Sequence, residues 1–198
     1  MSEHRDKYYY RAKKERFNSR AAYKLLEISR KFGIPREGDH DLEIGSSPGG
    51  WAQVITEITG KEVFCVDKNS MKKVPGAIFL RGDITRPEFL DELRETMSSR
   101  GVQSFDGILS DAMSQTTGNT SIDHSSSYLI CQSVMSLSAD FLREHGYVVV
   151  KQFQGDLTKT FFSEWGKRFA FSKITTVSAS RKGSKEIYMI FKDYRPQN

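Results

Sequence analysis

Short apolar runs alternate with longer amphipathic segments along the chain. The apolar runs predict seven strands, near residues 40–44, 62–66, 77–81, 105–110, 147–150, 172–178 and 186–192. The longer segments predict helices over residues 21–28, from about residue 50, and near 87–98, 126–143 and 158–169. Ser19 can cap the first of these helices, and Gly33 can end it.

This alternation predicts an α/β fold, with a mostly parallel seven-stranded sheet and helices on both faces. The turn-like segment 181–184 joins the last two strands and predicts an antiparallel hairpin at one edge. The Ser- and Thr-rich stretch 114–127 is expected to be a loop after the carboxyl end of a strand, where ligands bind in such sheets. Because 198 residues is the usual length of one domain, we expect a single domain over residues 1–198.

The composition excludes several classes of protein. No apolar run approaches the roughly 18 residues that a membrane-spanning helix needs, and the charged, aromatic N-terminus does not resemble a secretory signal. Cys65 and Cys131 lie in apolar segments without metal-ligand spacing, and the four histidines are scattered. We therefore expect a cytoplasmic protein with buried thiols, without a disulfide and without a metal site.

Positive charge is concentrated at the N-terminus. The chain has a net charge of +5, whereas residues 1–31 alone carry ten Lys or Arg against four acids. Tyr8, Tyr9, Tyr10 and Phe17 are interleaved with these bases. Cations neutralise phosphates and aromatic rings stack on bases, so residues 1–33 are expected to form a basic arm and helix that contact RNA. A merely solvated tail is the alternative.

A strand that runs into a glycine-rich turn and then a helix predicts a nucleotide-like cofactor. Gly45 allows a sharp turn, and Gly49 and Gly50 leave space for a ligand against the backbone. The dinucleotide motif G-x-G-x-x-G fails at Ser47, and the phosphate-binding P-loop fails at Trp51, where it needs lysine. A cofactor with a nucleoside but no pyrophosphate remains, and S-adenosylmethionine fits that description.

Acids at the ends of neighbouring strands extend this predicted site. Asp67 has the spacing of an acid that accepts hydrogen bonds from ribose hydroxyls, and Asp83 could accept one from an adenine amino group. A helix cap or a turn residue is the alternative for each acid. The expected cofactor-binding residues are Gly45, Gly49, Gly50, Trp51, Asp67, Asp83 and Asp111.

Five segments, in order along nearly the whole chain, carry a resemblance to a known family. They are Ser19–Ile28, Gly45–Trp51, Ser110-Asp111, Val150–Gly155 and Ser184–Tyr188. Together they resemble the FtsJ-type (heat-shock) ribosomal RNA ribose 2′-O-methyltransferases. The resemblance implies a Rossmann-like methyltransferase fold, S-adenosylmethionine as methyl donor, and as acceptor a uridine ribose in 23S-type RNA of the large ribosomal subunit.

The Lys-Asp-Lys-Glu tetrad of that family falls on Lys24, Asp111, Lys151 and Glu186. A ribose hydroxyl is a poor nucleophile at neutral pH, so its attack on a methyl group benefits from a base. Lys151 follows three valines, and burial beside a second cation favours the neutral amine that a base requires. We expect Asp111 and Glu186 to orient Lys151, and Lys24 to hold the acceptor.

Other methyltransferase classes fit less well. Asp111 is followed by Ala-Met-Ser, not by the Pro-Pro-Tyr/Phe pattern of enzymes that methylate exocyclic amines, and neither cysteine stands beside a proline as in carbon-5 methyltransferases. The same segment lacks the Pro-Asn pair that is common in the FtsJ-type family. Two alternatives stay open: a ribose methyltransferase that acts on transfer RNA or an mRNA cap, and a catalytically silent, RNA-binding assembly factor. We expect a monomer.

Overall fold

The computed structural model of the chain describes residues 8, 12, 15–181 and 183–196. Its helices are α2 (Ala22–Phe32), α3 (Gly50–Thr59), α4 (Pro87–Ser99), α5 (Thr120–Ser136), α6 (Ser138–Phe141) and α7 (Thr158–Gly166). Its strands are β1 (Asp41–Ile44), β2 (Val63–Asp67), β3 (Ala77–Arg81), β4 (Phe105–Ser110), β5 (Leu142–Phe153), β6 (Phe169–Thr175) and β7 (Glu186–Tyr194).

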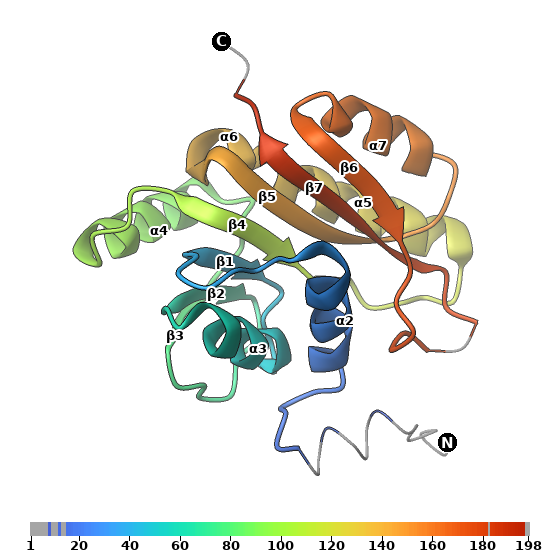
Figure 1. The fold of residues 1–198 in the computed structure, drawn as a ribbon. Helices are drawn as coiled ribbons and strands as arrows, with labels where there is room; N and C mark the ends of the chain where they lie inside the picture. Colours follow the sequence, from blue (N-terminus) through green and yellow to red (C-terminus); the bar gives the residue numbers. More distant parts are fainter. Residues whose placement is uncertain (1–7, 9–11, 13–14, 182, 197–198) are drawn as a thin grey trace.

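All seven strands form one sheet, in the order β3-β2-β1-β4-β5-β7-β6 (Figure 1). The pairs from β3 through β5 are parallel, and β7 is antiparallel to both of its neighbours, β5 and β6. The predicted α/β fold, the mostly parallel sheet and the antiparallel hairpin at one edge are confirmed. Although β7 comes last in the sequence, it lies inside the sheet.

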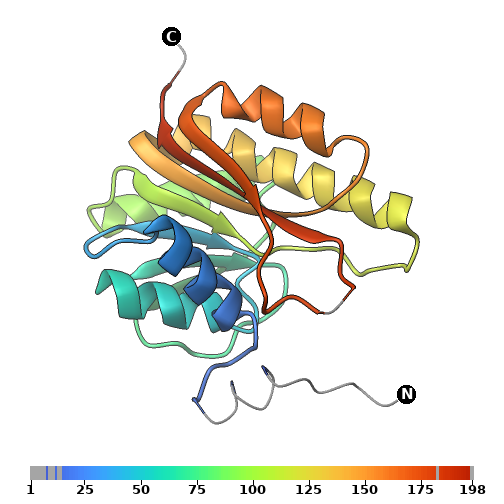
Figure 2. The same cartoon turned by 45° about the vertical axis from the view of Figure 1, so that its right-hand side comes forward.

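Helices cover both faces of the sheet, as predicted (Figure 2). Side chains of α2 and α3 pack on one face around Leu25, Trp51 and Ile55. Side chains of α4, α5 and α7 pack on the other face, where Leu93 and Phe161 are fully buried. Strands with both faces covered must be apolar on both sides, which is why they appear in the sequence as continuous apolar runs.

Two predicted boundaries are wrong around β5. The helix expected over residues 126–143 is α5 followed by the short α6, and α5 includes residues 120–127, which we expected to be loop. Asn119 caps α5, because its Oδ1 accepts from the backbone N–H groups of Ser121 at 3.0 Å and Ile122 at 3.4 Å. Strand β5 is three times longer than expected, because Leu142 already pairs with Phe105 of β4.

The start of α2 also differs from the prediction. Its N-cap residue is Ala21, and no side chain caps it. Ser19 Oγ is buried and has no hydrogen-bond partner among the described residues, so the proposed Ser19 cap is wrong. The other end is as predicted, since Gly33 has a positive φ of 66° and donates its N–H to Ser29.

Part of the basic N-terminal segment packs against the body of the protein. Tyr8, Ala12 and Phe17 cluster with Tyr23 of α2 and with Ala179, which lies between β6 and β7. Half of the ten basic residues and two of the four aromatic residues named for the predicted arm lie outside the described residues, as does one residue of the predicted hairpin turn: Arg5, Lys7, Arg11, Lys13, Lys14, Tyr9, Tyr10 and Lys182.

Both cysteines, Cys65 and Cys131, are buried and free. Across the described part of the chain, the helices are too short or too polar to cross a membrane. Within the same ranges, His, Cys, Asp and Glu side chains form no group of three that could hold a metal ion.

A buried acid at the amino-terminal edge of β1 makes stability depend on pH. Asp41 is fully buried, accepts a 2.6 Å hydrogen bond from Tyr147 and leaves Oδ2 without a partner among the described residues. Burial raises the pKa of Asp41 well above its ordinary value, against the smaller opposing effect of the Tyr147 hydrogen bond, and burial raises the pKa of Glu43 as well. Both acids therefore hold their protons in the folded protein.

We expect the free energy of unfolding to fall as pH rises above about 4, where the unfolded chain releases these protons and the folded chain keeps them. Asp41→Asn removes one of the two groups, so the decline above about pH 4 should become shallower. Urea denaturation at several pH values measures this slope. Asp91→Asn, at an exposed position of α4, is the matched control, and an equal change of slope in both variants would contradict the assignment to Asp41.

Candidate active site

Four charged residues from four separate segments meet at the carboxyl edge of the parallel strands. Lys24 lies on α2, Asp111 follows β4, Lys151 lies near the end of β5, and Glu186 begins β7. Lys151 pairs with Tyr188 and Phe153 pairs with Glu186 in the antiparallel register of β5 and β7. Because side chains alternate along a strand, Lys151 and Glu186 share one face. The structure thus brings all four predicted catalytic residues together.

The four side chains alternate in sign around a closed ring. Lys24 Nζ lies 2.7 Å from Glu186 Oε1 and 3.7 Å from Asp111 Oδ1. Lys151 Nζ lies 3.0 Å from Asp111 Oδ1 and 3.7 Å from Glu186 Oε1. Lys151 also donates a 2.5 Å hydrogen bond to the backbone carbonyl of Asp111. Each ammonium group therefore faces both carboxylates.

These charges are withdrawn from water. Lys24 is 9% exposed, Lys151 is 3% exposed and Glu186 is 7% exposed. A buried charge is costly unless it is paired, so loss of one member leaves its partners buried without compensation. Lysine is rarely buried to this extent, which distinguishes Lys151 from the solvated lysines of the surface.

Asp111 is more acidic than an ordinary aspartate. Burial alone raises the pKa of its carboxyl, but the charges of Lys151 and then Lys24, with hydrogen bonds from Tyr188 and Lys151, lower that pKa by more. The carboxylate therefore stays ionised next to the two lysines. Burial raises the pKa of Tyr188 well above its ordinary value, so its hydroxyl keeps the proton that it donates to Asp111 Oδ1 at 2.8 Å.

Sequence reasoning missed two residues that hold the ring in place, Tyr188 and Ser180. Tyr188 is fully buried. Its ring centroid lies 5.7 Å from Lys24 Nζ, and its hydroxyl donates a hydrogen bond to Asp111. Ser180 donates a 2.6 Å hydrogen bond to Glu186 Oε2, the oxygen that Lys24 does not contact. The signal for Tyr188 was its place two residues after Glu186, on the same face of the strand. No local signal marks Ser180.

The glycine-rich turn between β1 and α3 lies beside this ring. Gly45 has a positive φ of 80°, and a Cβ there would overlap the backbone of Ala112, next to Asp111. The turn and the end of β4 are thus in direct contact. The N–H groups of Gly45 and Ser46 donate to Val66 of β2, and that of Ser47 donates to Asp67 Oδ2 at 2.9 Å.

Gly49 and Gly50 are needed for a reason that the sequence did not reveal. A Cβ at Gly50 would overlap Ser19 Oγ, and a Cβ at Gly49 would crowd Val74 and Asn18. The space that we assigned to a ligand at these two positions is filled by other parts of the chain. The glycines let the segment before α2 cross the start of α3.

Trp51 and Gln53 fasten that crossing segment to α3. The Trp51 side chain is 1% exposed, and its Nε1–H donates a 2.8 Å hydrogen bond to the carbonyl of Ala21. Gln53 accepts from the backbone of Asn18 at 2.7 Å. The Trp51 indole therefore packs in the core, and only its backbone can serve a ligand at the helix start.

The two strand-end acids occupy different surroundings. Asp67 accepts hydrogen bonds from Ser47 and from Asn69, and so ties the end of β2 to the glycine-rich turn. Asp83 is paired with Lys68 at 2.8 Å, and this ammonium group lowers the pKa of Asp83 to about 2. Asp83 also accepts from Thr85. A ligand amine at Asp83 would have to compete with Lys68.

The turn has the groups that a nucleoside-containing cofactor needs. Ser46 Oγ is buried and has no hydrogen-bond partner among the described residues, so one polar atom in the turn is left for a ligand. Helix α3 also begins here, and the first N–H groups of a helix have no partner within it. Asp67 adds a carboxylate at the neighbouring strand end. The residues present therefore fit such a cofactor.

Known proteins share this architecture over nearly the whole chain. The model of the family described as FtsJ-like methyltransferase matches residues 17–194. A protein of Thermoplasma acidophilum named ribosomal RNA large subunit methyltransferase E is 49% identical over 190 residues, covering 96% of this chain and 92% of that protein. The protein of the same name from Picrophilus torridus is 46% identical, covering 94% and 96%.

A solved structure agrees with these sequence matches. The crystal structure of a protein from Plasmodium falciparum, described as a ribosomal RNA methyltransferase, superposes with a TM-score of 0.81 at 27% identity. It covers 91% of this chain and 100% of its own. The family model over residues 17–194 and the relatives at 49% and 46% identity show that the chain belongs to the FtsJ-like methyltransferase family.

Proposed function

We propose that the protein transfers a methyl group from S-adenosylmethionine to a ribose 2′-hydroxyl in large-subunit ribosomal RNA. The observation that carries this proposal is the buried ring of Lys24, Asp111, Lys151 and Glu186 beside the glycine-rich turn. A ring with a buried lysine suits the activation of a hydroxyl group. The names of the relatives support ribosomal RNA as the acceptor.

In this proposal the donor lies along the carboxyl edge of β1 and β2. The turn after β1 would contact it through the buried Ser46 hydroxyl, because the N–H groups of Gly45 and Ser46 already donate to Val66. Asp67 would accept hydrogen bonds from the ribose hydroxyls of the donor. Asp83 would accept one from the adenine amino group only if Lys68 were displaced from it. S-adenosylmethionine, when bound, supplies a methyl group on a positively charged sulfur.

Lys151 is the proposed general base. The amine of Lys151 would take the proton of the 2′-hydroxyl, whose oxygen would attack the methyl group that S-adenosylmethionine would supply. Asp111 and Glu186 then stabilise the resulting ammonium group, which they face at 3.0 Å and 3.7 Å. Lys24, held by Glu186, is left to position the acceptor ribose or its phosphate.

We also propose which nucleotide is methylated: a uridine within the large ribosomal subunit. It follows from the FtsJ-type resemblance of the five sequence segments. The basic residues before α2 would contact the RNA backbone, since cations that neutralise phosphates contribute most of the affinity for RNA. The protein is proposed to act as a monomer.

A single labelling experiment tests the proposal. The protein is incubated with methyl-labelled S-adenosylmethionine and total RNA, the RNA classes are separated, and each class is digested to nucleosides. We expect the label in 2′-O-methyluridine from large-subunit RNA. Label on a base would refute ribose methylation. Label in transfer RNA or at an mRNA cap would refute the ribosomal acceptor and favour a ribose methyltransferase of another substrate class.

A further inference from the structure

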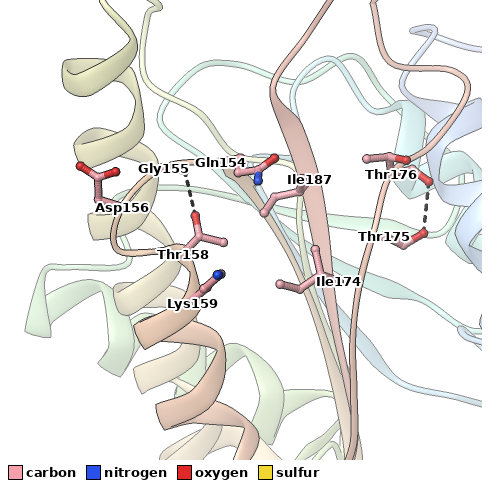
Figure 3. A pocket seen from close by; sticks show the side chains of 9 residues that line it. All are labelled: Gln154, Gly155, Asp156, Thr158, Lys159, Ile174, Thr175, Thr176 and Ile187. Atoms are coloured by element: carbon pink, nitrogen blue, oxygen red, sulfur yellow. Dashed lines mark hydrogen bonds between the residues drawn. The ribbon is translucent and has the colours of Figure 1, made fainter.

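A hollow of about 720 Å³ lies between the start of α7 and the strands β6 and β7 (Figure 3). Gln154 and Asp156 line it from the loop that leaves β5, and Lys159 lines it from the first turn of α7. The opposite wall is formed by Ile174 and Thr175 of β6. Lys159 and Ile174 approach one another across the hollow from these two walls (Figure 3).

This hollow lies at the same edge of the sheet as the tetrad, but on the other face. Ile187 lines the hollow and directly follows Glu186, so the α-carbons of the two residues are about 3.8 Å apart. Because successive side chains of a strand point to opposite faces, Glu186 points to the tetrad and Ile187 to the hollow. An extended strand of RNA that crosses the start of β7 therefore passes from one to the other.

The wall of the hollow is fixed by a buried histidine. His124 of α5 bonds through Nδ1 to the carbonyl of Phe153 at 2.8 Å, and it accepts at Nε2 from the N–H of Leu157 at 3.2 Å. Gly155 packs against the same imidazole ring, where a Cβ would overlap it. The N–H of Gln154 donates to the carbonyl of Lys185 at 2.9 Å, which joins the wall to the segment that enters β7. The hollow is therefore preformed.

The lining suits a nucleobase better than a phosphate group. It offers one cation, Lys159, and one anion, Asp156, so its charges cancel and it has no excess of positive charge for a polyanion. Gln154, whose side-chain amide is both a donor and an acceptor, can bond to a base edge of either kind. Ile174 and Ile187 add apolar surface for the face of the ring.

We propose that this hollow binds the base of a nucleotide adjacent to the methylated ribose, and so selects the RNA sequence around the target. This inference rests on the proposed function, because it places the target ribose at the tetrad. The neighbouring nucleotide crosses the start of β7, and its base is turned out into the hollow. Single-stranded RNA permits this, since its unstacked bases can be splayed into protein pockets.

Two variants and a modified RNA test this assignment. Thr176→Trp fills the hollow from an exposed position, and Lys159→Ala removes its cation. The acceptor is a short oligoribonucleotide that the wild type methylates, either intact or with an abasic nucleotide on the 5′ or the 3′ side of the target. We expect each variant to raise KM for the intact RNA about tenfold, with kcat and the Kd for S-adenosylmethionine unchanged.

The abasic RNAs identify the contact itself. At one of the two flanking positions, removal of the base should raise KM for the wild type and cancel the difference between wild type and Thr176→Trp. Lys61→Ala, at an exposed turn after α3, is the matched control for the lost charge and should leave KM unchanged. Equal thermal unfolding midpoints for all variants show that the fold is intact.

The outcomes separate this inference from the function on which it rests. Unchanged KM in both variants, with an active wild type, would refute the subsite and leave ribose methylation standing. The subsite is refuted in the same way if the KM effect of Thr176→Trp persists with both abasic RNAs. A wild type that methylates no RNA would refute the proposed function, and the subsite with it.

Discussion

Replacing Lys151 with alanine should lower kcat for methyl transfer by about 10²–10⁴-fold, the range that a positioned general base contributes. Lys151 is 3% exposed and lies within the ring of charges. The Kd for the methyl donor should change little, because the glycine-rich turn does not depend on this side chain. Single-turnover methylation and donor titration measure the two quantities separately.

Lys151→Arg distinguishes a base from a fixed positive charge. Arginine keeps the charge beside Asp111 but cannot lose its proton at accessible pH, so this variant should be as slow as the alanine variant. Lys173→Ala, on exposed β6, is the control and should retain full activity. Near wild-type kcat in Lys151→Arg would show that Lys151 is not the base.

The largest effect on stability is expected from Trp51→Ala. Deleting a large, fully buried aromatic side chain costs about 3–5 kcal/mol, a large part of the stability of an ordinary domain. Trp51 packs with its ring centroid 6.1 Å from that of Tyr188 and bonds to Ala21, so the cavity would also loosen the contact between α2 and α3. Urea denaturation followed by circular dichroism measures the change without using tryptophan fluorescence as the signal.

Trp51→Phe separates packing from the hydrogen bond. Phenylalanine keeps most of the apolar contact but cannot donate to the carbonyl of Ala21, so the free energy of unfolding should fall by only about 1–2 kcal/mol. If Trp51→Ala cost no more than Trp51→Phe, the indole would not be the packing centre between the two helices.

The part of the site that follows from strand ends could be predicted from the sequence. Asp111 and Lys151 stand at the ends of apolar runs, and the carboxyl ends of parallel strands meet at one edge of a sheet. Lys24 and Glu186 are 162 positions apart and carry no local sign of proximity, so only the resemblance to a family placed them together. The structure joins them at 2.7 Å.

Features that depend on contacts between distant segments could not be predicted. The spacing of Gly49 and Gly50 suggested that a ligand lies against their backbone. Nothing nearby in the sequence shows that the segment with Ser19 crosses the start of α3 there. Likewise, residues 120–127 are rich in Ser and Thr, which favour loops and caps, yet they form the first turns of α5 because Asn119 caps them and Ser127 is buried.

The position of β7 has a consequence for the biosynthesis of the enzyme. This strand is synthesised last but pairs between β5 and β6, and Glu186 is its first residue. Residues 24 to 151 can leave the ribosome and pair their parallel strands while the fourth charge is still missing. A nascent or prematurely terminated chain therefore lacks a closed ring, and under the proposed function it would become active only when the final strand inserts into the sheet.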